Sequence, residues 1–204
     1  MIESGLTAHS VWHGFGAGRH GRPTGIASTT ITARRPLAMA SLSARHGAAN
    51  GLAQATLQAW GVTLPVTPHR VDTGELAFIW MGPERWLVTS EQGRELAPTL
   101  RTALPDLVYL TEQGDGRAVI RIAGPRARDA LAKILPIDLH ARAFGPNATA
   151  LTLAAHIGVQ IWRVGDADCF EVSVFRSLAA DLLDWLVDAS AEFGTDLIIE
   201  SDAA

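Results

Sequence analysis

The chain has 204 residues, of which 48% are hydrophobic and 19% are charged, a balance typical of one large or two small globular domains. This composition excludes a wholly disordered chain, a collagen and a disulfide scaffold, because Cys169 is the only cysteine. The net charge of −4 is unevenly distributed, since no acid lies between Glu3 and Asp72. That stretch carries six arginines, whereas 20 acids face 11 bases from Asp72 onward. Such a division can mark a face for a charged partner, or it can be an accident of composition.

The same composition argues against several kinds of site. A single cysteine cannot build a zinc–thiolate site or an iron–sulfur cluster. No apolar run approaches the ~20 residues that span a bilayer, and the first residues form no secretory signal, so neither a membrane nor an exported protein is expected. The acidic balance and the lack of a basic helix also argue against nucleic acid as a partner. We therefore expect a cytoplasmic protein.

The glycine-rich residues 1–24 are expected to form a flexible N-terminal arm. Residues 16–21 match the pattern G-x-G-x-x-G, but the segment before them is too short for a strand, and Pro23 and Gly25 follow where a helix would have to begin. A dinucleotide site needs both flanking elements, so none is predicted here. The histidines of this segment are not predicted to bind a metal, because nothing in the sequence orients them.

Residues 25–194 are expected to form one α+β domain, and residues 195–204 a C-terminal tail. Alternating apolar residues and turn signals predict strands over 26–44 (broken near Pro36), 76–80, 86–89, 107–111, 117–123, 151–164 (broken at Gly158) and 170–175. Helical periodicity predicts helices over 50–60, 94–104, 125–135 and 178–193. Turns near Gly82 and Gly114 predict hairpins. A unit of strand, turn and helix recurs three times, so antiparallel or mixed sheets with packed helices and an internal duplication are predicted.

Residue types alone predict no catalytic, cofactor-binding or metal-binding residue. The sequence has no G-x-S-x-G elbow, no phosphate-binding loop and no metal-ligand spacing of histidines. Asp138 and His140 could act in general acid–base chemistry, or they could form a local hydrogen-bonded turn. Cys169 lies in an apolar strand and is expected to be a small buried side chain.

Nine residues are candidates for an interface or an anion contact. The first group follows one predicted strand and the helix after it, and it could bind a carboxylate-rich ligand, an acidic partner or its own neighbouring acids: Arg117, Arg121, Arg126, Arg128 and Arg142. Arg34 and Arg35 lie in the acid-free part of the chain, where a large acidic partner could dock. Trp80 and Trp86 flank a hairpin turn, where an exposed ring could anchor an interface.

Four segments, in order and with matching spacing, resemble one known family. They are WMGPERWLV at residues 80–88, GRAVIRIAGPRARDALA at 116–132, PIDLH at 136–140 followed by Phe144, and VFRSLA at 174–179 followed by Trp185 and Leu186. Together they are similar to the gamma subunit of heterotetrameric sarcosine oxidase, over about residues 25–192.

This resemblance implies a fold related to the folate-binding domain of the glycine-cleavage T protein. It also implies a subunit of a complex that oxidatively demethylates sarcosine to glycine. In that family the alpha and beta subunits hold FAD, FMN and NAD, the alpha subunit also binds tetrahydrofolate, and the delta subunit holds zinc. The gamma chain is assigned no cofactor of its own, so a non-catalytic, structural role beside alpha, beta and delta subunits is expected. An isolated gamma chain can self-associate through a face that a partner covers.

Two further functions stay open from the sequence. One is a folate-binding, aminomethyltransferase-like protein that uses the arginines between residues 117 and 142 for a glutamate tail. The other is a subunit of a related demethylase acting on dimethylglycine or another methylated amine.

Overall fold

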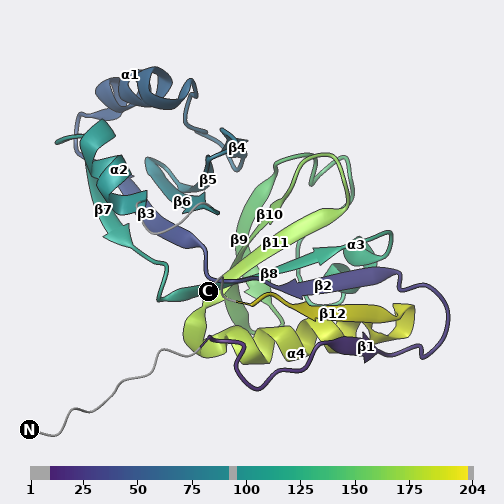
Figure 1. Ribbon diagram of the computed structural model, residues 1–204. Helices are drawn as coiled ribbons and strands as arrows, with labels where there is room; N and C mark the ends of the chain where they lie inside the picture. The colour runs from purple at the N-terminus through teal and green to yellow at the C-terminus, as the bar shows by residue number, and fades with distance from the viewer. Residues whose placement is uncertain (1–9, 92–95, 202–204) are drawn as a thin grey trace, which may run out of the picture.

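Two β-sheets, each covered by helices on one face, form the molecule (Figure 1). The computed structural model describes residues 10–91 and 96–201. Sheet A has seven strands, which in spatial order are β1 (Gly18–His20), β12 (Thr195–Ile199), β2 (Thr29–Ala33), β8 (Arg117–Ala123), β11 (Cys169–Phe175), β10 (Ile157–Arg163) and β9 (Thr149–Ala154). Neighbouring strands are antiparallel except β12 and β2, which are parallel.

Sheet B is inserted into sheet A as a second lobe. Its five antiparallel strands are, in spatial order, β4 (Arg70–Asp72), β5 (Leu76–Gly82), β6 (Arg85–Ser90), β3 (Ala38–Ala44) and β7 (Val108–Glu112). The chain passes from sheet A into sheet B between β2 and β3, and it returns between β7 and β8. Both connections are short, so they hold the two sheets close together.

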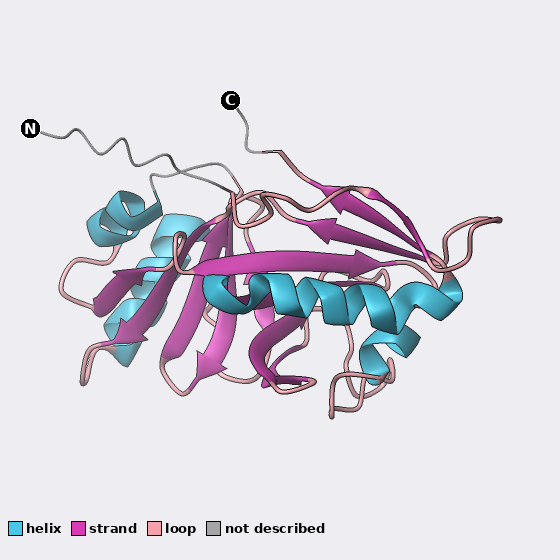
Figure 2. Cartoon of the chain, turned by 90° about the horizontal axis from the view of Figure 1, so that it is seen from below, coloured by secondary structure: helices cyan, strands magenta, loops and turns pink. Residues whose placement is uncertain are grey.

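Helices cover the outer face of each sheet. Sheet B packs against α1 (Ala49–Trp60) and α2 (Leu96–Ala103). Sheet A packs against α3 (Ala127–Ala132) and α4 (Ala179–Ser190). Two short 3-10 turns flank α4, namely η1 (Arg176–Leu178) and η2 (Ala191–Phe193). Figure 2 shows α4 lying along its sheet. A third apolar cluster joins the inner faces of the two sheets and contains Leu37, Met39, Ile79, Leu87, Val119 and Trp162. The α+β class with antiparallel and mixed sheets is thus confirmed.

Local sequence explains several of these elements. Helix α1 buries Leu52 and Thr56, which are one turn apart, and it ends at Gly61 in the left-handed conformation with φ 70°. The hairpin predicted near Gly82 is formed by β5 and β6, with Glu84 in the turn at φ 55°. The predicted break near Pro36 is the connection between the sheets.

Two strand predictions were wrong. The segments around Gly114 do not pair, because β7 bonds to β3 in sheet B while β8 bonds to β2 and β11 in sheet A. The predicted break at Gly158 also shifts, because the turn between β9 and β10 is at Ala155, with φ 52°, and His156. The first error arises because a turn signal does not specify which strands pair. The second arises because Ala155, and not a glycine, adopts the left-handed conformation in this turn.

The predicted boundaries 1–24, 25–194 and 195–204 need correction at both ends. Trp12 is only 2% exposed and packs in the core of sheet A, and β1 adds a strand to the same sheet. Residues 195–199 form β12 between β1 and β2. Residues 10–24 and 195–199 are therefore parts of the folded domain, whereas residues 1–9 and 202–204 of the predicted arm and tail lie outside the described residues.

Candidate functional site

A charged cluster lies where the chain leaves β2 for sheet B. Its centre is Arg34, which is only 4% exposed. The backbone at this residue is fixed, because its N–H donates to the Val119 carbonyl at 3.1 Å. Its carbonyl accepts a hydrogen bond from the indole Nε1 of Trp12 at 2.7 Å. The sequence predicted that Arg34 lies on a surface where an acidic partner docks. This prediction is wrong, because the side chain is buried.

The guanidinium of Arg34 contacts three carboxylates. Nη2 lies 3.0 Å from Glu91 Oε1, Nε donates to Glu200 Oε2 at 3.1 Å, and Nη1 donates to Glu171 Oε1. Burial by itself would lower the pKa of Arg34, but the attraction of Glu171 and the two other carboxylates raises it above its ordinary value. Arg34 therefore stays charged at the junction of the two sheets.

Glu171 is the buried anion of this cluster, with a side chain 7% exposed. Besides Arg34, it accepts hydrogen bonds at Oε1 from Arg121 Nε and Nη2, at 3.1 and 2.7 Å. Its other oxygen, Oε2, accepts the indole Nε1 of Trp162 at 2.9 Å. Both carboxylate oxygens are thus used, as a buried charge requires.

Beside this cluster is an open pocket of about 510 Å³, lined by Arg34, Arg35, Glu91, Arg121, Ile199, Glu200 and Ser201. Arg35 contributes its backbone N–H, which donates to Glu200 Oε2 at 3.0 Å, and its Nη2, which donates to the Glu91 carbonyl at 3.3 Å. Three arginines here face Glu91, Glu200 and Glu171, so the charges balance. The arrangement ties the end of β6 in sheet B to strands β2, β8 and β11 of sheet A, and it holds the two sheets together.

Glu91 gives this cluster a predictable pH dependence. The hydrogen bond from Arg34 lowers the pKa of Glu91 below its ordinary value of 4.5. A lowered carboxyl pKa in the folded state stabilises the protein above the ordinary pKa, and this contribution is lost as the pH falls through the lowered pKa. Because the side chain is 58% exposed, we expect Glu91→Gln to reduce the free energy of unfolding at pH 7 by less than about 1 kcal/mol.

Urea unfolding of the wild type and of Glu91→Gln, at pH 7 and at pH 3, measures this effect. The difference between the two proteins should shrink at the lower pH. A difference that is equal at both values would contradict the proposed role of the charge.

The structure divides the arginines that sequence grouped between residues 117 and 142. Arg121 belongs to the Glu171 cluster. Arg126 pairs with Asp129 at 2.7 Å, as the alternative of internal pairing predicted, and its guanidinium lies 4.4 Å from the centre of the Phe193 ring. Arg128 pairs with Asp168 at 2.7 Å and also donates to the Leu139 carbonyl. These three side chains do not form one anion site.

Arg117 and Arg142 behave differently from the others. Arg117 forms no ion pair within residues 10–91 and 96–201, and its guanidinium lies 4.8 Å from the centre of the Phe175 ring. Burial lowers the pKa of Arg117 from its ordinary value, and no carboxylate offsets that effect. Arg142 is exposed, and its backbone N–H donates to His140 Nδ1 at 3.2 Å.

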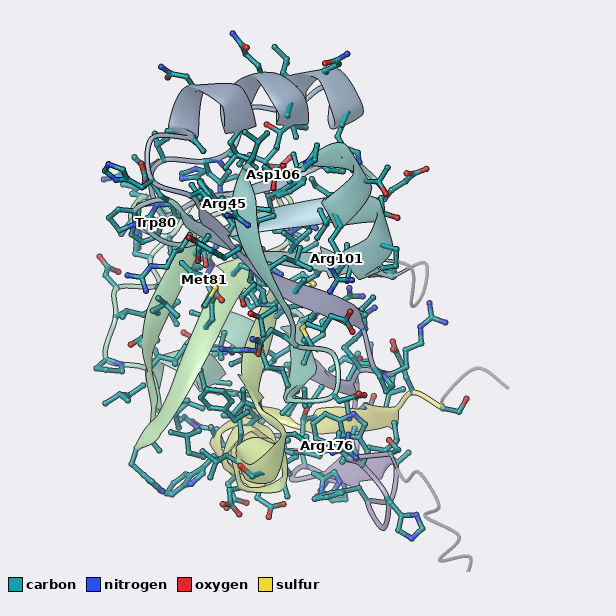
Figure 3. The ribbon with its side chains drawn as sticks, turned by 90° about the vertical axis from the view of Figure 1, so that its left-hand side faces the viewer. Arg45, Trp80, Met81, Arg101, Asp106 and Arg176 are labelled. Atoms are coloured by element: carbon teal, nitrogen blue, oxygen red, sulfur yellow. The ribbon has the colours of Figure 1, made fainter. Side chains whose placement is uncertain are left out.

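Only one of the two hairpin tryptophans lies partly at the surface. Trp86 is 5% exposed, and its indole N–H donates to the Pro65 carbonyl at 2.8 Å, so it packs in the core of sheet B. Trp80 is half-buried beside Met81 at the edge of the molecule (Figure 3). Trp185 is 42% exposed and lies edge-on to His156.

Sequence reasoning missed the three acids of the charged cluster. Glu171 alternates with buried Phe170 and Val172, so its strand position indicated only that it faces away from them. Glu91 and Glu200 lie in or beside loops and carried no signal. Their common partner, Arg34, is 137 residues from Glu171 and 166 from Glu200 along the chain.

Other candidate groups were also placed by the structure. The Asp138 carboxylate accepts the backbone N–H of His140 at 2.8 Å, which is the local turn. Cys169 is half-buried, and burial raises the pKa of its thiol. Within the described residues, no group of three or more His, Cys, Asp or Glu side chains could hold a metal ion, and no helix is long and apolar enough to cross a membrane.

Comparison with known proteins identifies relatives of this chain. The model of the sarcosine oxidase gamma subunit family matches residues 45–192. The chain is 36% identical over 121 residues to sarcosine oxidase subunit gamma of Corynebacterium sp. strain P-1, covering 59% of each protein. It is 34% identical over 138 residues to the corresponding subunit of strain U-96, covering 66% of this chain and 67% of that one. The first of these relatives is therefore matched over about three fifths of its length.

Solved structures show the same fold. A chain of heterotetrameric sarcosine oxidase from Corynebacterium sp. U-96, in complex with pyrrole 2-carboxylate, is 29% identical, with a TM-score of 0.73 over 89% of this chain and 90% of that chain. The glycine cleavage system aminomethyltransferase T from Bartonella henselae is 14% identical, with a TM-score of 0.58 over 84% of this chain and 48% of that chain, a likeness of fold alone. The family model covers most of the described domain, from the residue after β3 to η2, and the chain belongs to the sarcosine oxidase gamma subunit family.

Proposed function

We propose that this chain is the gamma subunit of a heterotetrameric sarcosine oxidase, a complex that oxidatively demethylates sarcosine to glycine. The observation that carries the proposal is the family match over residues 45–192. It is supported by the likeness of nearly the whole chain to one chain of a solved heterotetrameric sarcosine oxidase.

Within such a complex, the role we propose is structural. Most of the arginines that sequence singled out are paired with carboxylates of this chain, as Arg34 is with Glu171 and Arg128 with Asp168. Paired in this way, they hold strands together and are not free to act on a substrate. The cofactors then belong to the partners: FAD, FMN, NAD and tetrahydrofolate to the alpha and beta subunits, and zinc to the delta subunit. The proposed location of the complex is the cytoplasm.

The folate-binding alternative is not favoured. The relatives with substantial identity are gamma subunits of sarcosine oxidase, and the aminomethyltransferase shares only the fold. Arg117, Arg121, Arg126 and Arg128, which that alternative needs as one site, have separate partners or none. No feature of this chain favours the other alternative, a subunit of a demethylase for dimethylglycine or another methylated amine.

Co-expression with the other subunits of the oxidase tests the proposal. With an affinity tag on the largest subunit, we expect this chain to be retained in equal amount with the other subunits, in a complex that oxidises sarcosine. Dimethylglycine serves as the comparison substrate. A complex that forms without this chain and oxidises sarcosine as fast would contradict a structural role, and faster oxidation of dimethylglycine would contradict the substrate.

A further inference from the structure

One part of the inner face of sheet A extends beyond the region that sheet B covers. We call it the Phe175 face, defined by Arg117, Leu151, Leu153, Gly158 and Phe175. Strand register places these side chains together: Arg117 pairs with Phe175, Gly158 with Leu153, and Gln160 with both Leu151 and Ser173. Since side chains two residues apart share a face of a strand, the five residues lie on one side of β8, β11, β10 and β9.

This face belongs to the same surface as the charged cluster but lacks its cover. On β8, Val119 lies two residues from Arg117, and on β10, Gln160 lies two residues from Gly158. Glu171 on β11 and Trp162 on β10 lie two residues further along the same surface. All four side chains are buried. Figure 3 views the molecule from this side, with Met81 of the β5–β6 hairpin above the strands of sheet A and Arg176 below, just after the end of β11. The inner face is thus buried at one end of its strands and open at the other.

The open end is apolar. Phe175, Leu151 and Leu153 are 53%, 53% and 49% exposed, and they are three of the large hydrophobic side chains exposed among the described residues. A Cβ atom added at Gly158 would meet no atom within 4 Å, so the space directly over Gly158 is open. Grouped apolar side chains around an unfilled space are typical of a protein interface.

The face also holds a cation without a counter-charge. The two other arginines in the central strands of sheet A, Arg121 and Arg163, each lie within 4.0 Å of a carboxylate. Arg117 has no carboxylate within 4.0 Å among the described residues. Its guanidinium lies 4.8 Å from the centre of the Phe175 ring, and its Nε atom is buried without a hydrogen-bond partner in that part of the chain. An arginine partly removed from water without a partner is costly, and a carboxylate would offset that cost.

We propose that the Phe175 face docks another subunit of the oxidase, through a segment that presents a carboxylate to Arg117 and an apolar side chain to the space over Gly158. The inference rests on the proposed function, because the docking partner is another subunit of the proposed heterotetramer. The positive charge of Arg117 favours an acidic segment as the binding partner. The apolar side chains around it favour a protein surface, because a free anion would leave Phe175, Leu151 and Leu153 exposed.

The test uses the whole complex, co-expressed with a tag on the largest subunit and immobilised through it. The rate at which this chain dissociates into buffer is measured for the wild type, Arg117→Gln and Gly158→Arg. Gly158→Arg places a long side chain in the docking space, and its Cβ atom meets no atom of this chain within 4 Å. We expect each variant to dissociate on the order of tenfold faster or more, since interface changes act mainly on dissociation.

Matched controls come from the helices of the other lobe. Arg101→Gln removes a charge whose side chain is 59% exposed on α2, and Leu57→Arg replaces an apolar side chain 56% exposed on α1. Both should dissociate at the wild-type rate. The thermal midpoint of each purified complex identifies any variant that unfolds instead of undocking, and Arg117→Lys, which keeps the charge, should dissociate more slowly than Arg117→Gln.

The outcomes separate this inference from the proposed function. If the wild-type chain is retained and the two face variants dissociate at its rate, the docking proposal is wrong and the subunit assignment stands. If the wild-type chain itself does not associate with the other subunits, both proposals are wrong. Self-association of this chain that Gly158→Arg abolishes, with the heterotetramer unchanged, would assign the face to a second copy and overturn the proposal.

Discussion

Replacing Arg34 with glutamine is expected to lower the free energy of unfolding by about 3–5 kcal/mol, the range found when one partner of a buried ion pair is removed. The side chain is 3% exposed and contacts Glu171, Glu91 and Glu200. Its loss leaves the buried Glu171 carboxylate with Arg121 as its one ionic partner within residues 10–91 and 96–201, and it separates β2 from the carboxylates at the ends of β6 and β12. Urea unfolding followed by circular dichroism measures the change.

Arg35→Gln is the matched control, because the neighbouring arginine is half-buried at the rim of the same pocket. Among the described residues its side chain donates to the Glu91 carbonyl alone, at 3.3 Å, and its backbone contact to Glu200 survives the substitution. We expect a loss below about 1 kcal/mol, as for exposed polar contacts. Equal losses for the two variants would show that burial of Arg34 does not set its contribution.

Replacing Trp12 with alanine is expected to cost about 3–5 kcal/mol, as for other buried large aromatic side chains. The ring is 2% exposed in the core of sheet A, lies edge-on to Phe15 with 6.4 Å between the ring centres, and donates its N–H to the Arg34 carbonyl. The substitution removes apolar contacts and leaves that carbonyl without the indole donor. Deleting residues 1–22 should therefore destabilise the domain as well, since it removes both Trp12 and β1.

Trp185→Ala provides the comparison within the same lobe. That ring is 42% exposed, so its removal leaves a smaller cavity and should cost about 1 kcal/mol. The thermal midpoints of the two variants and of the wild type measure the difference. A Trp12 variant as stable as Trp185→Ala would contradict the packing of the N-terminal segment into the core.

Much of the fold was predictable from local sequence. The apolar alternation of residues 117–123 and 170–175 predicted β8 and β11, and Gly61 predicted the end of α1. In each case the physical cause lies within a few residues: side chains alternate across a strand, and glycine adopts a left-handed conformation at low cost. The order of four short segments also predicted the family, which the comparisons confirmed.

The pairing of the strands and the fate of the charges were not predictable in this way. The turn near Gly114 looks like a hairpin, but it carries the chain from sheet B back to sheet A. Trp12 lies in a glycine-rich segment typical of a flexible arm, yet it fills the core because β12, at the other end of the chain, brings β1 into sheet A.

The arginines show the same division most clearly. Sequence alone determined that arginine is concentrated in an acid-free first part of the chain and in the stretch after residue 116. Only the tertiary structure decided that Arg34 is buried against Glu171 and Glu200, whereas Arg117 is left with a phenylalanine ring. Burial depends on which strands become neighbours, and Arg34 is 137 residues from Glu171 and 166 from Glu200 along the chain, so no local pattern distinguishes a paired arginine from an unpaired one.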